Sequence, residues 1–312
     1  MIHSTRKKSN VLQKFVLFLA AVVFLALPAT AQRPAQKTFP TPEDAVVALV
    51  DAVKANNTAG MAAILGPEAR SAIASGDEVA DRKGRDLFVA AYFQRASISG
   101  DGNTKTLQIG SEEWPFPIPV VKEASGWRFD TAAGIDELRY RRIGRNELST
   151  IEACLSYHAA QKEYAQNSHD GKTSGTYAHK FMSAPGKQDG LFWKVKEGEE
   201  PSPLGELAAE AAAEGYTRST GKPTPFRGYY FRILTAQGTD AAGGARSYIV
   251  NGLMRNGFAL VAFPAEYGKG GVMTFVVNQD GVVFEKDLGA DTAKIAAAIR
   301  EYNPDKTWSK AE

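Results

Sequence analysis

The sequence predicts an α+β fold of two domains, in which helices pack on antiparallel sheets. Between residues 42 and 95 apolar residues recur at helical spacing, and up to residue 129 they then alternate as in strands. The same order, a long helix before several strands, returns between residues 135 and 288. The hydrophobic fraction of 44% and charged fraction of 23% are those of a globular chain.

Residues 1–31 have the pattern of a secretory signal peptide. An uninterrupted apolar run spans 15–27, and Ala29 and Ala31 follow it in an A-x-A arrangement. The run is about 13 residues long, shorter than a membrane-spanning helix needs. Its basic flank consists of Arg6, Lys7, Lys8 and Lys14. We therefore expect cleavage after Ala31, no membrane anchor on the mature chain, and a periplasmic or secreted location.

The charge of the mature chain argues against nucleic acid as a partner. Cleavage removes four of the 37 Lys and Arg residues and none of the 35 Asp and Glu residues, which leaves 33 against 35 and a net charge of −2. Nucleic-acid binding depends on neutralising phosphates, so a chain near neutrality lacks its main driving force. Cys154 is the only cysteine, so the fold has no intrachain disulfide and depends on its cores.

The first domain is expected over residues 41–135, after a linker at 32–40. Thr41 is placed to cap a helix that has Pro42 at its first position. Two short helical pieces broken at Gly66–Pro67 come next, and then a helix over about 81–95. Strand-type residues follow, with a hairpin turn at Ala124–Ser125–Gly126.

The second domain is expected over residues 136–302, followed by a tail at 303–312. Its long helix covers about 135–166, with a kink near Gly144. A loop-rich zone and a helix ending at Gly215 precede the strands. These strands are expected within 227–237, 257–265, 270–278 and 281–288, and an amphipathic helix at 291–302 closes the domain. The turn Asn278–Gly281 predicts a hairpin between the last two strands.

Several motifs carry resemblances to known folds and to one family. Helices followed by curved strands that end in "SGWRFD" resemble the nuclear-transport-factor-two-like (NTF2-like) cone, which implies a concave mouth for a small ligand. The long helix before "GYYF" and "VNQDGVVFEKDL" resembles the head of type IV pilins and pseudopilins. The ordered set "WPFPIP", "GWRFD", "RRIGRNE", "YHAAQKEYA", "QDGLFW" and "GFALVAFPAEYGKGGVMTFVVN" resembles a bacterial family of secreted proteins, domain-of-unknown-function family 2950. That resemblance implies a fold and a location, and it assigns no catalytic residues.

Cys154 and His158 are one helical turn apart, so they are either a nucleophile with its base or two core side chains. On a helical projection, Leu148, Ile151, Cys154, Leu155, His158, Ala159 and Ala165 share one arc, while Tyr157 and Tyr164 mark a second, half-buried side. A reactive thiol is partly exposed in an electropositive setting, whereas this apolar arc predicts burial. We therefore interpret the pair as packing.

The other candidate sites are weaker than this pair. Cys154, His158, His169 and His179 could supply four metal ligands, but they lack a tight ligand spacing. "DGKTSG" at 170–175 lacks the first glycine of a phosphate loop, and "YGKGGV" at 267–272 is interpreted as a turn between strands. Neighbouring glutamates such as Glu112 and Glu113 point to opposite faces of a strand. We expect no cofactor, no metal and no catalytic residue.

The sequence therefore predicts a secreted protein that acts as a non-enzymatic binding or envelope-assembly module. Its partner is unknown and could be another envelope protein. Two alternatives stay open. One is a small-ligand-binding or thiol-dependent enzyme with a pocket near Cys154 and His158, and the other is a structural subunit that assembles through its sheet edge.

Overall fold

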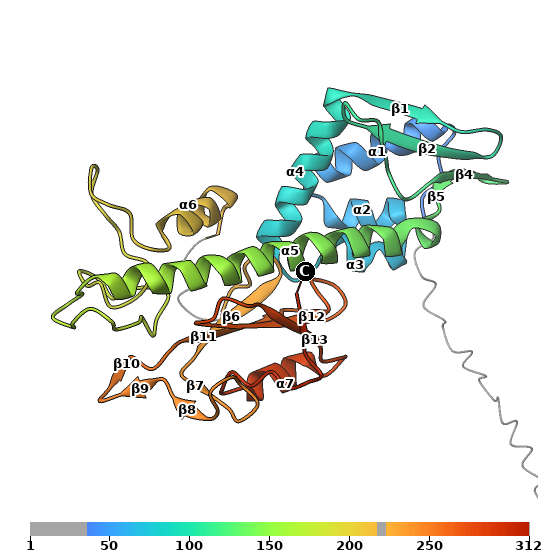
Figure 1. Cartoon of the computed structure of the whole chain (residues 1–312). Coiled ribbons are helices and arrows are strands. Elements are labelled where there is room, and N and C mark those ends of the chain that lie inside the picture. The colour runs from blue at the N-terminus through green and yellow to red at the C-terminus, as the bar shows by residue number, and fades with distance from the viewer. Residues whose placement is uncertain (1–35, 217–222, 312) are drawn as a thin grey trace, which may run out of the picture. The chain divides into compact units, whose positions relative to one another are not determined.

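The computed structural model describes residues 36–216 and 223–311 and confirms the α+β class (Figure 1). Residues 35–312 form one compact unit that encloses two separate hydrophobic cores. The predicted signal peptide at 1–31 lies outside the described residues, and the predicted domain boundaries remain a prediction. Within the described ranges, no helix has both the length and the apolar character needed to cross a bilayer.

The first core is built from short helices and a small sheet. Its helices are α1 (Pro42–Lys54), α2 (Thr58–Leu65), η1 (Pro67–Ala69), α3 (Arg70–Ile73) and α4 (Glu78–Gln94). As predicted, Thr41 caps α1 by accepting a hydrogen bond from the Asp44 N–H, and the chain breaks between α2 and η1 at Gly66. Helix α4 begins three residues before the expected start, because the Asp77 side chain caps it through the Ala80 N–H.

The sheet of this core is antiparallel, with the order β1–β2–β4–β5 and β3 paired to β2. Its strands are β1 (Ala96–Ser99), β2 (Thr104–Ile109), β3 (Trp114–Pro115), β4 (Val120–Glu123) and β5 (Gly126–Phe129). The predicted hairpin joins β4 to β5, with Glu123 opposite Gly126. Leu107, Phe116, Ile118 and Phe129 are buried against α1 and α2. These side chains fill the inner side of the sheet, so the expected ligand site in a cone has no support here.

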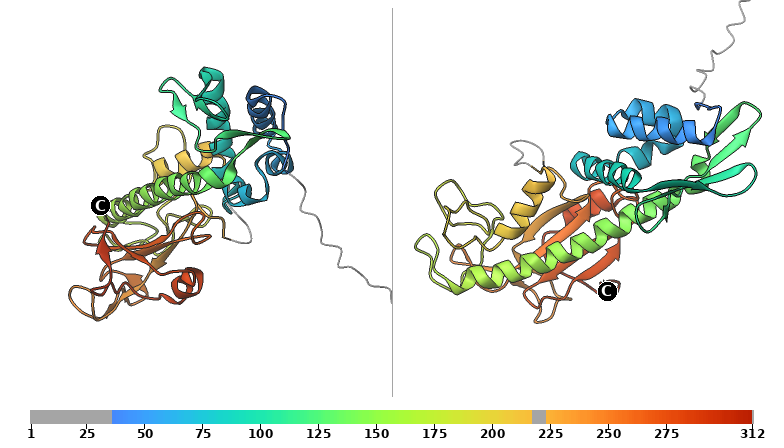
Figure 2. Two further views of the ribbon diagram at one scale, coloured as in Figure 1. Left: turned by 90° about the vertical axis from the view of Figure 1, so that its right-hand side faces the viewer. Right: turned by 90° about the horizontal axis from the view of Figure 1, so that it is seen from above.

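Helix α5 (Thr131–Gln166) runs uninterrupted through Gly144 and links the two cores (Figure 2). Its first turns contact η1 and α3, and its later turns cross β12 and β11. The prediction of its buried arc is wrong in two respects. Leu148 and Leu155 are 60% and 44% exposed, whereas Tyr157 and Tyr164 are fully buried. The buried face is turned toward Thr150, Tyr157 and Gln161. Tyr157 and Gln161 find hydrogen-bond partners in the second core, and the Thr150 hydroxyl donates to the Asn146 carbonyl of its own helix.

The main sheet of the second core has the antiparallel order β14–β13–β12–β11–β6. Tyr229 of β6 reaches Glu147 of α5, and Arg232 donates to carbonyls of α7, so the two helices lie on opposite faces of the sheet. The predicted Asn278–Gly281 turn joins β12 to β13, and Gly215 ends α6 in the left-handed conformation. The elements are α6 (Gly205–Glu214), β6 (Tyr229–Leu234), β7 (Ala236–Gln237), β8 (Arg246–Ser247), β9 (Ile249–Val250), β10 (Leu253–Met254), β11 (Ala259–Pro264), β12 (Met273–Asn278), β13 (Phe284–Asp287), α7 (Thr292–Ala298) and β14 (Ser309–Lys310).

Two segments expected to be peripheral are integrated into the fold. In the predicted linker, the Gln36 side chain donates to the carbonyls of Ile64 and Phe129, and Phe39 pairs with Trp127. In the predicted tail, β14 pairs with β13 and Trp308 packs on the second core. Both stretches are short and polar in sequence, and their described residues, 36–40 and 303–311, are held by hydrogen bonds to residues far away in the chain.

Candidate functional site

Cys154 lies on the buried face of α5, inside the second core, and is fully shielded from solvent. Burial raises the pKa of its thiol to about 12, so the thiol is protonated at neutral pH. The His158 ring packs on Phe258, and its Nε2 lies 3.2 Å from the carbonyl oxygen of Gln279. The pair therefore has the surroundings of packed side chains and lacks the exposed, electropositive setting of a nucleophile.

The structure does not bring the four proposed metal ligands together. His169 stacks on Tyr164, with 4.0 Å between ring centroids, and its ring nitrogens face the Tyr164 carbonyl and the Gln188 side chain. Burial, followed by the charges of Lys172 and Lys180, lowers the pKa of His179. Among the described residues, no three His, Cys, Asp or Glu side chains are placed to hold one ion.

The glycine turn at 267–272 is held by a carboxylate of this chain. Glu147 of α5 accepts hydrogen bonds from the N–H groups of Val272 and Met273, at 2.8 and 3.0 Å. The neighbouring Asn146 donates to the Gly270 carbonyl at 2.8 Å. N–H groups that could have wrapped an external anion are thus occupied by Glu147, and the turn docks the sheet on α5.

Most aromatic residues of the motifs "WPFPIP" (114–119) and "GYYF" (228–231) are core residues. Phe116 and Tyr229 are buried, and Tyr230 packs against Phe263. Trp114 is the exception, because it is 39% exposed and lies under the Arg141 guanidinium at 4.5 Å. Of the paired glutamates, Glu113 forms an ion pair with Arg95.

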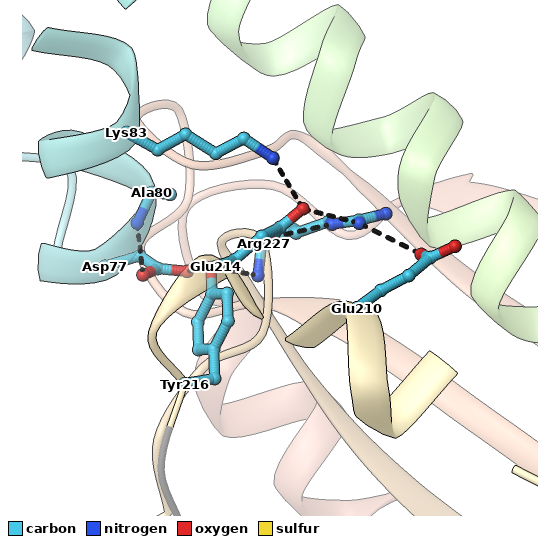
Figure 3. A network of polar contacts seen from close by, with 7 residues as sticks. All are labelled: Asp77, Ala80, Lys83, Glu210, Glu214, Tyr216 and Arg227. Atoms are coloured by element: carbon cyan, nitrogen blue, oxygen red, sulfur yellow. Dashed lines mark hydrogen bonds and ion pairs between the residues drawn. The ribbon is translucent and has the colours of Figure 1, made fainter. Parts of the chain in front are cut away.

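A polar network that the sequence analysis missed joins α4 to α6 and to the start of β6 (Figure 3). Asp77 is 2% exposed, caps α4, and accepts hydrogen bonds from the Tyr216 hydroxyl and the Gly228 N–H, both at 2.8 Å. The Tyr216 hydroxyl accepts from the Arg227 N–H at 2.9 Å. Burial, followed by the charge of Asp77, raises the pKa of Tyr216. The Asp–Glu sequence before an apolar helix signals the cap, but nothing local indicates the two distant donors.

The outer part of this network is formed by ion pairs. Glu214 of α6 bonds Lys83 at 2.6 Å and Arg227 at 2.8 Å, and Glu210 lies 3.5 Å from Arg227. Burial opposes ionisation of Glu214, but the hydrogen bonds from Arg227 and Lys83 outweigh it, so the pKa of Glu214 is lowered. The charged groups of this network form ion pairs with one another. Such a network serves as a structural joint between α4, α6 and the start of β6.

The outward side of α5 is the strongest candidate for a contact surface. Leu148 and Leu155 are largely exposed there, and Ile151 between them is half-buried. A groove of about 450 Å³ runs beside Leu148 and Ile151, between α5 and the strands β13 and β14. Its lining consists of Gly144, Glu147, Leu148, Ile151, Glu285, Ser309 and Lys310. Apolar side chains in a partly charged groove are typical of a surface that meets another macromolecule.

Comparison with known families places this geometry in context. The sequence matches the family described as "Protein of unknown function (DUF2950)" over residues 36–311. The chain belongs to the DUF2950 family. The match includes both cores, α5 and the groove beside it, and the family description names no activity.

No curated protein and no solved structure matches this DUF2950 chain. The likeness of its first half to NTF2-like cones and of its second half to pilin heads therefore remains a prediction. A second hollow, of about 390 Å³, lies between α7, β12 and β13. Leu288, Ile299 and Trp308 form apolar walls there, with Lys286 and Arg300 beside them.

Proposed function

We propose that this DUF2950 protein is exported through a cleaved signal peptide and acts outside the cytoplasm as a non-enzymatic binding or assembly module. The observation that carries the proposal is the outward side of α5, where Leu148 and Leu155 are exposed beside a groove. Three further observations support it: the export pattern of residues 1–31, the burial of Cys154, and the internal pairing of the Asp77 network.

Export is tested by fractionating cells that produce the full chain. We expect the mature protein in the periplasmic fraction or the medium, with Gln32 as its first residue. Replacing Ala29 and Ala31 by bulky residues should cause the precursor to accumulate, because the peptidase requires small side chains at these positions. An uncleaved chain that stays in the cytoplasm with Met1 as its first residue contradicts this part of the proposal.

The contact surface is tested by site-specific photo-crosslinking in the producing cells. A photoreactive amino acid at Leu155 should give a discrete covalent adduct, and the same amino acid at Leu87 of α4, which is 59% exposed, serves as the matched control. We expect adducts at position 155 only. Equal labelling at both positions, or no adduct at either, contradicts a dedicated surface on α5.

The enzymatic alternative is tested through the Cys154 thiol. A thiol with a pKa of about 12, shielded inside the second core, should react with a disulfide reagent no faster than the native structure opens. Added zinc should leave that rate unchanged, because Cys154, His158, His169 and His179 do not converge. Rapid native-state labelling at neutral pH, or protection by zinc, would restore the alternative of a site near Cys154 and His158.

Assembly through the sheet edge has weaker support than the surface on α5. At one edge of the main sheet, β14 contains only Ser309 and Lys310, so it offers very few backbone groups to an added strand. The opposite edge strand, β6, is longer, but it lies away from the groove beside α5. At the β14 edge, side-chain contacts on α5 are therefore favoured over strand addition.

A further inference from the structure

We infer that the outward side of α5 binds a second copy of this chain, with the two α5 helices antiparallel about a two-fold axis beside Leu148. This inference rests on the proposed function and names the occupant of the same surface. A two-fold interface uses one patch twice, so the patch must be complementary to itself. The outward side of α5 meets that condition in its charges, its apolar residues and one glycine.

Arg145 and Glu152 give the outward side of α5 charges that are complementary to a second copy of itself. Both side chains are exposed, and neither has a hydrogen bond or ion pair with another described residue. Seven residues separate them, which is about two helical turns, so they lie on the same side of α5 without reaching each other. The nearby arginines of the helix are already paired, Arg139 with Asp136, Arg141 with Glu137 and Arg142 with Asp81.

An antiparallel second copy satisfies both of these charges at once. Arg145 of each copy then faces Glu152 of the other, which gives two equivalent ion pairs. The midpoint between these residues falls between Leu148 and Ser149, so the exposed Leu148 side chains of the two copies meet next to the axis. Leu155 of the second copy lies opposite the turn that contains Gly144, next to the groove beside α5.

Gly144 and Gly134 of α5 differ in the space that surrounds their Cα atoms. A Cβ atom added at Gly134 would lie 2.1 Å from the Pro117 carbonyl oxygen, so internal packing requires that glycine. A Cβ atom at Gly144 meets no other atom within 4 Å, although glycine weakens a helix interior. The packing of a single described chain therefore gives no reason for Gly144, whereas a helix approaching closely on this side does.

The decisive experiment is a charge swap followed by sedimentation across a concentration series of the mature protein. We expect a concentration-dependent dimer. Arg145→Glu and Glu152→Arg should each raise the dimer dissociation constant at least about tenfold, because each reversal creates two like-charge contacts. The double variant should return to near the wild-type constant. Circular dichroism should be unchanged, since both positions are exposed in the single chain.

Two further variants distinguish a weakened dimer from a misfolded protein. Gly144→Ala should raise the thermal midpoint of the monomer and weaken the dimer, a pair of effects that misfolding does not produce. Leu148→Asp should give a folded monomer, and Leu87→Asp on α4 should keep the dimer. A wild-type protein that stays monomeric, or single reversals that the double variant does not rescue, overturns the inference. A Leu155 crosslink to a different protein would do the same, while leaving the proposed binding function intact.

Discussion

The two cores of this protein are built in different ways. The first, between Ala45 and Phe129, consists almost entirely of aliphatic and phenylalanine side chains. The second, between Cys154 and Tyr302, buries five tyrosines together with Gln161, His169 and Gln237. The two cores differ in their buried polar side chains because different segments surround them. Regular helices and strands enclose the first core, whereas the irregular segment 167–204 also packs on the second.

The buried polar groups of the second core act as partners for that irregular segment. The Gln161 side chain bonds both the N–H and the carbonyl of Ala178, at 2.9 and 2.6 Å. The Tyr164 hydroxyl donates to the Gln188 carbonyl at 2.7 Å, and burial raises its pKa to about 12. A buried backbone without strand neighbours needs such side chains, because an unpaired buried N–H or carbonyl is costly. The stability of the first core therefore depends on packed volume, and that of the second core depends also on hydrogen bonds.

Loss of Asp77, at the joint between the two regions, should destabilise the protein more than any other substitution considered below. Asp77→Ala removes the cap of α4 and leaves the Gly228 N–H and the Tyr216 hydroxyl without their acceptor. We expect the free energy of unfolding to fall by about 3–4 kcal/mol, from the lost cap and the unsatisfied donors. Urea unfolding measures it, with the exposed Asp51→Ala on α1 as a control that should change stability by less than about 0.5 kcal/mol. A loss no larger than that of the control would mean that the joint is dispensable.

A matched pair of substitutions tests the contrast between the cores directly. Gln161→Met in the second core keeps the side-chain volume but removes both hydrogen bonds to Ala178. It should lower the free energy of unfolding by about 2–3 kcal/mol. Leu107→Met in the first core also keeps the volume and should cost less than about 1.5 kcal/mol. Urea unfolding of both variants gives the comparison. Equal losses would show that the two cores are stabilised in the same way.

The smallest effect is a pH dependence at Asp189, in the irregular segment. Hydrogen bonds from Lys180 and from the Ala184 N–H lower the pKa of Asp189 to about 2, below its usual 3.8. A lowered carboxyl pKa stabilises the fold above the usual value, and this contribution disappears as the pH falls through about 2. Asp189→Asn should therefore reduce stability by less than about 1 kcal/mol at pH 6, with a smaller difference near pH 2.5. A difference that grows on acidification would contradict this assignment.

Much of the local structure could be predicted from residue patterns alone. The Thr41 cap, the break at Gly66, the hairpin turn at Asn278–Gly281 and the end of α6 at Gly215 all occur where the sequence indicates them. Each depends on a residue whose own conformation or side chain creates the feature. The predicted burial of Cys154 is also confirmed, although Leu148 and Leu155 of the arc on which the prediction rested are exposed.

The orientation of α5 and the Asp77 network could not be predicted in this way. The helix carries two candidate stripes, one with Leu148 and Leu155 and another with Thr150, Tyr157 and Gln161. Apolar periodicity favours the first, but the second faces the core, because its polar groups find acceptors and donors that a helical projection cannot show. In the same way, Asp77 meets partners that lie 139 and 151 residues further along the chain.

The main helices and strands of this protein, their order, the α+β class and the expectation of export follow from the sequence alone. These follow from spacing, caps and turns within a few residues of one another. The tertiary structure alone decided which side of α5 is buried and which remains free to bind. That choice depends on whether polar groups far apart in the chain can satisfy one another in the interior, and no local pattern contains this information.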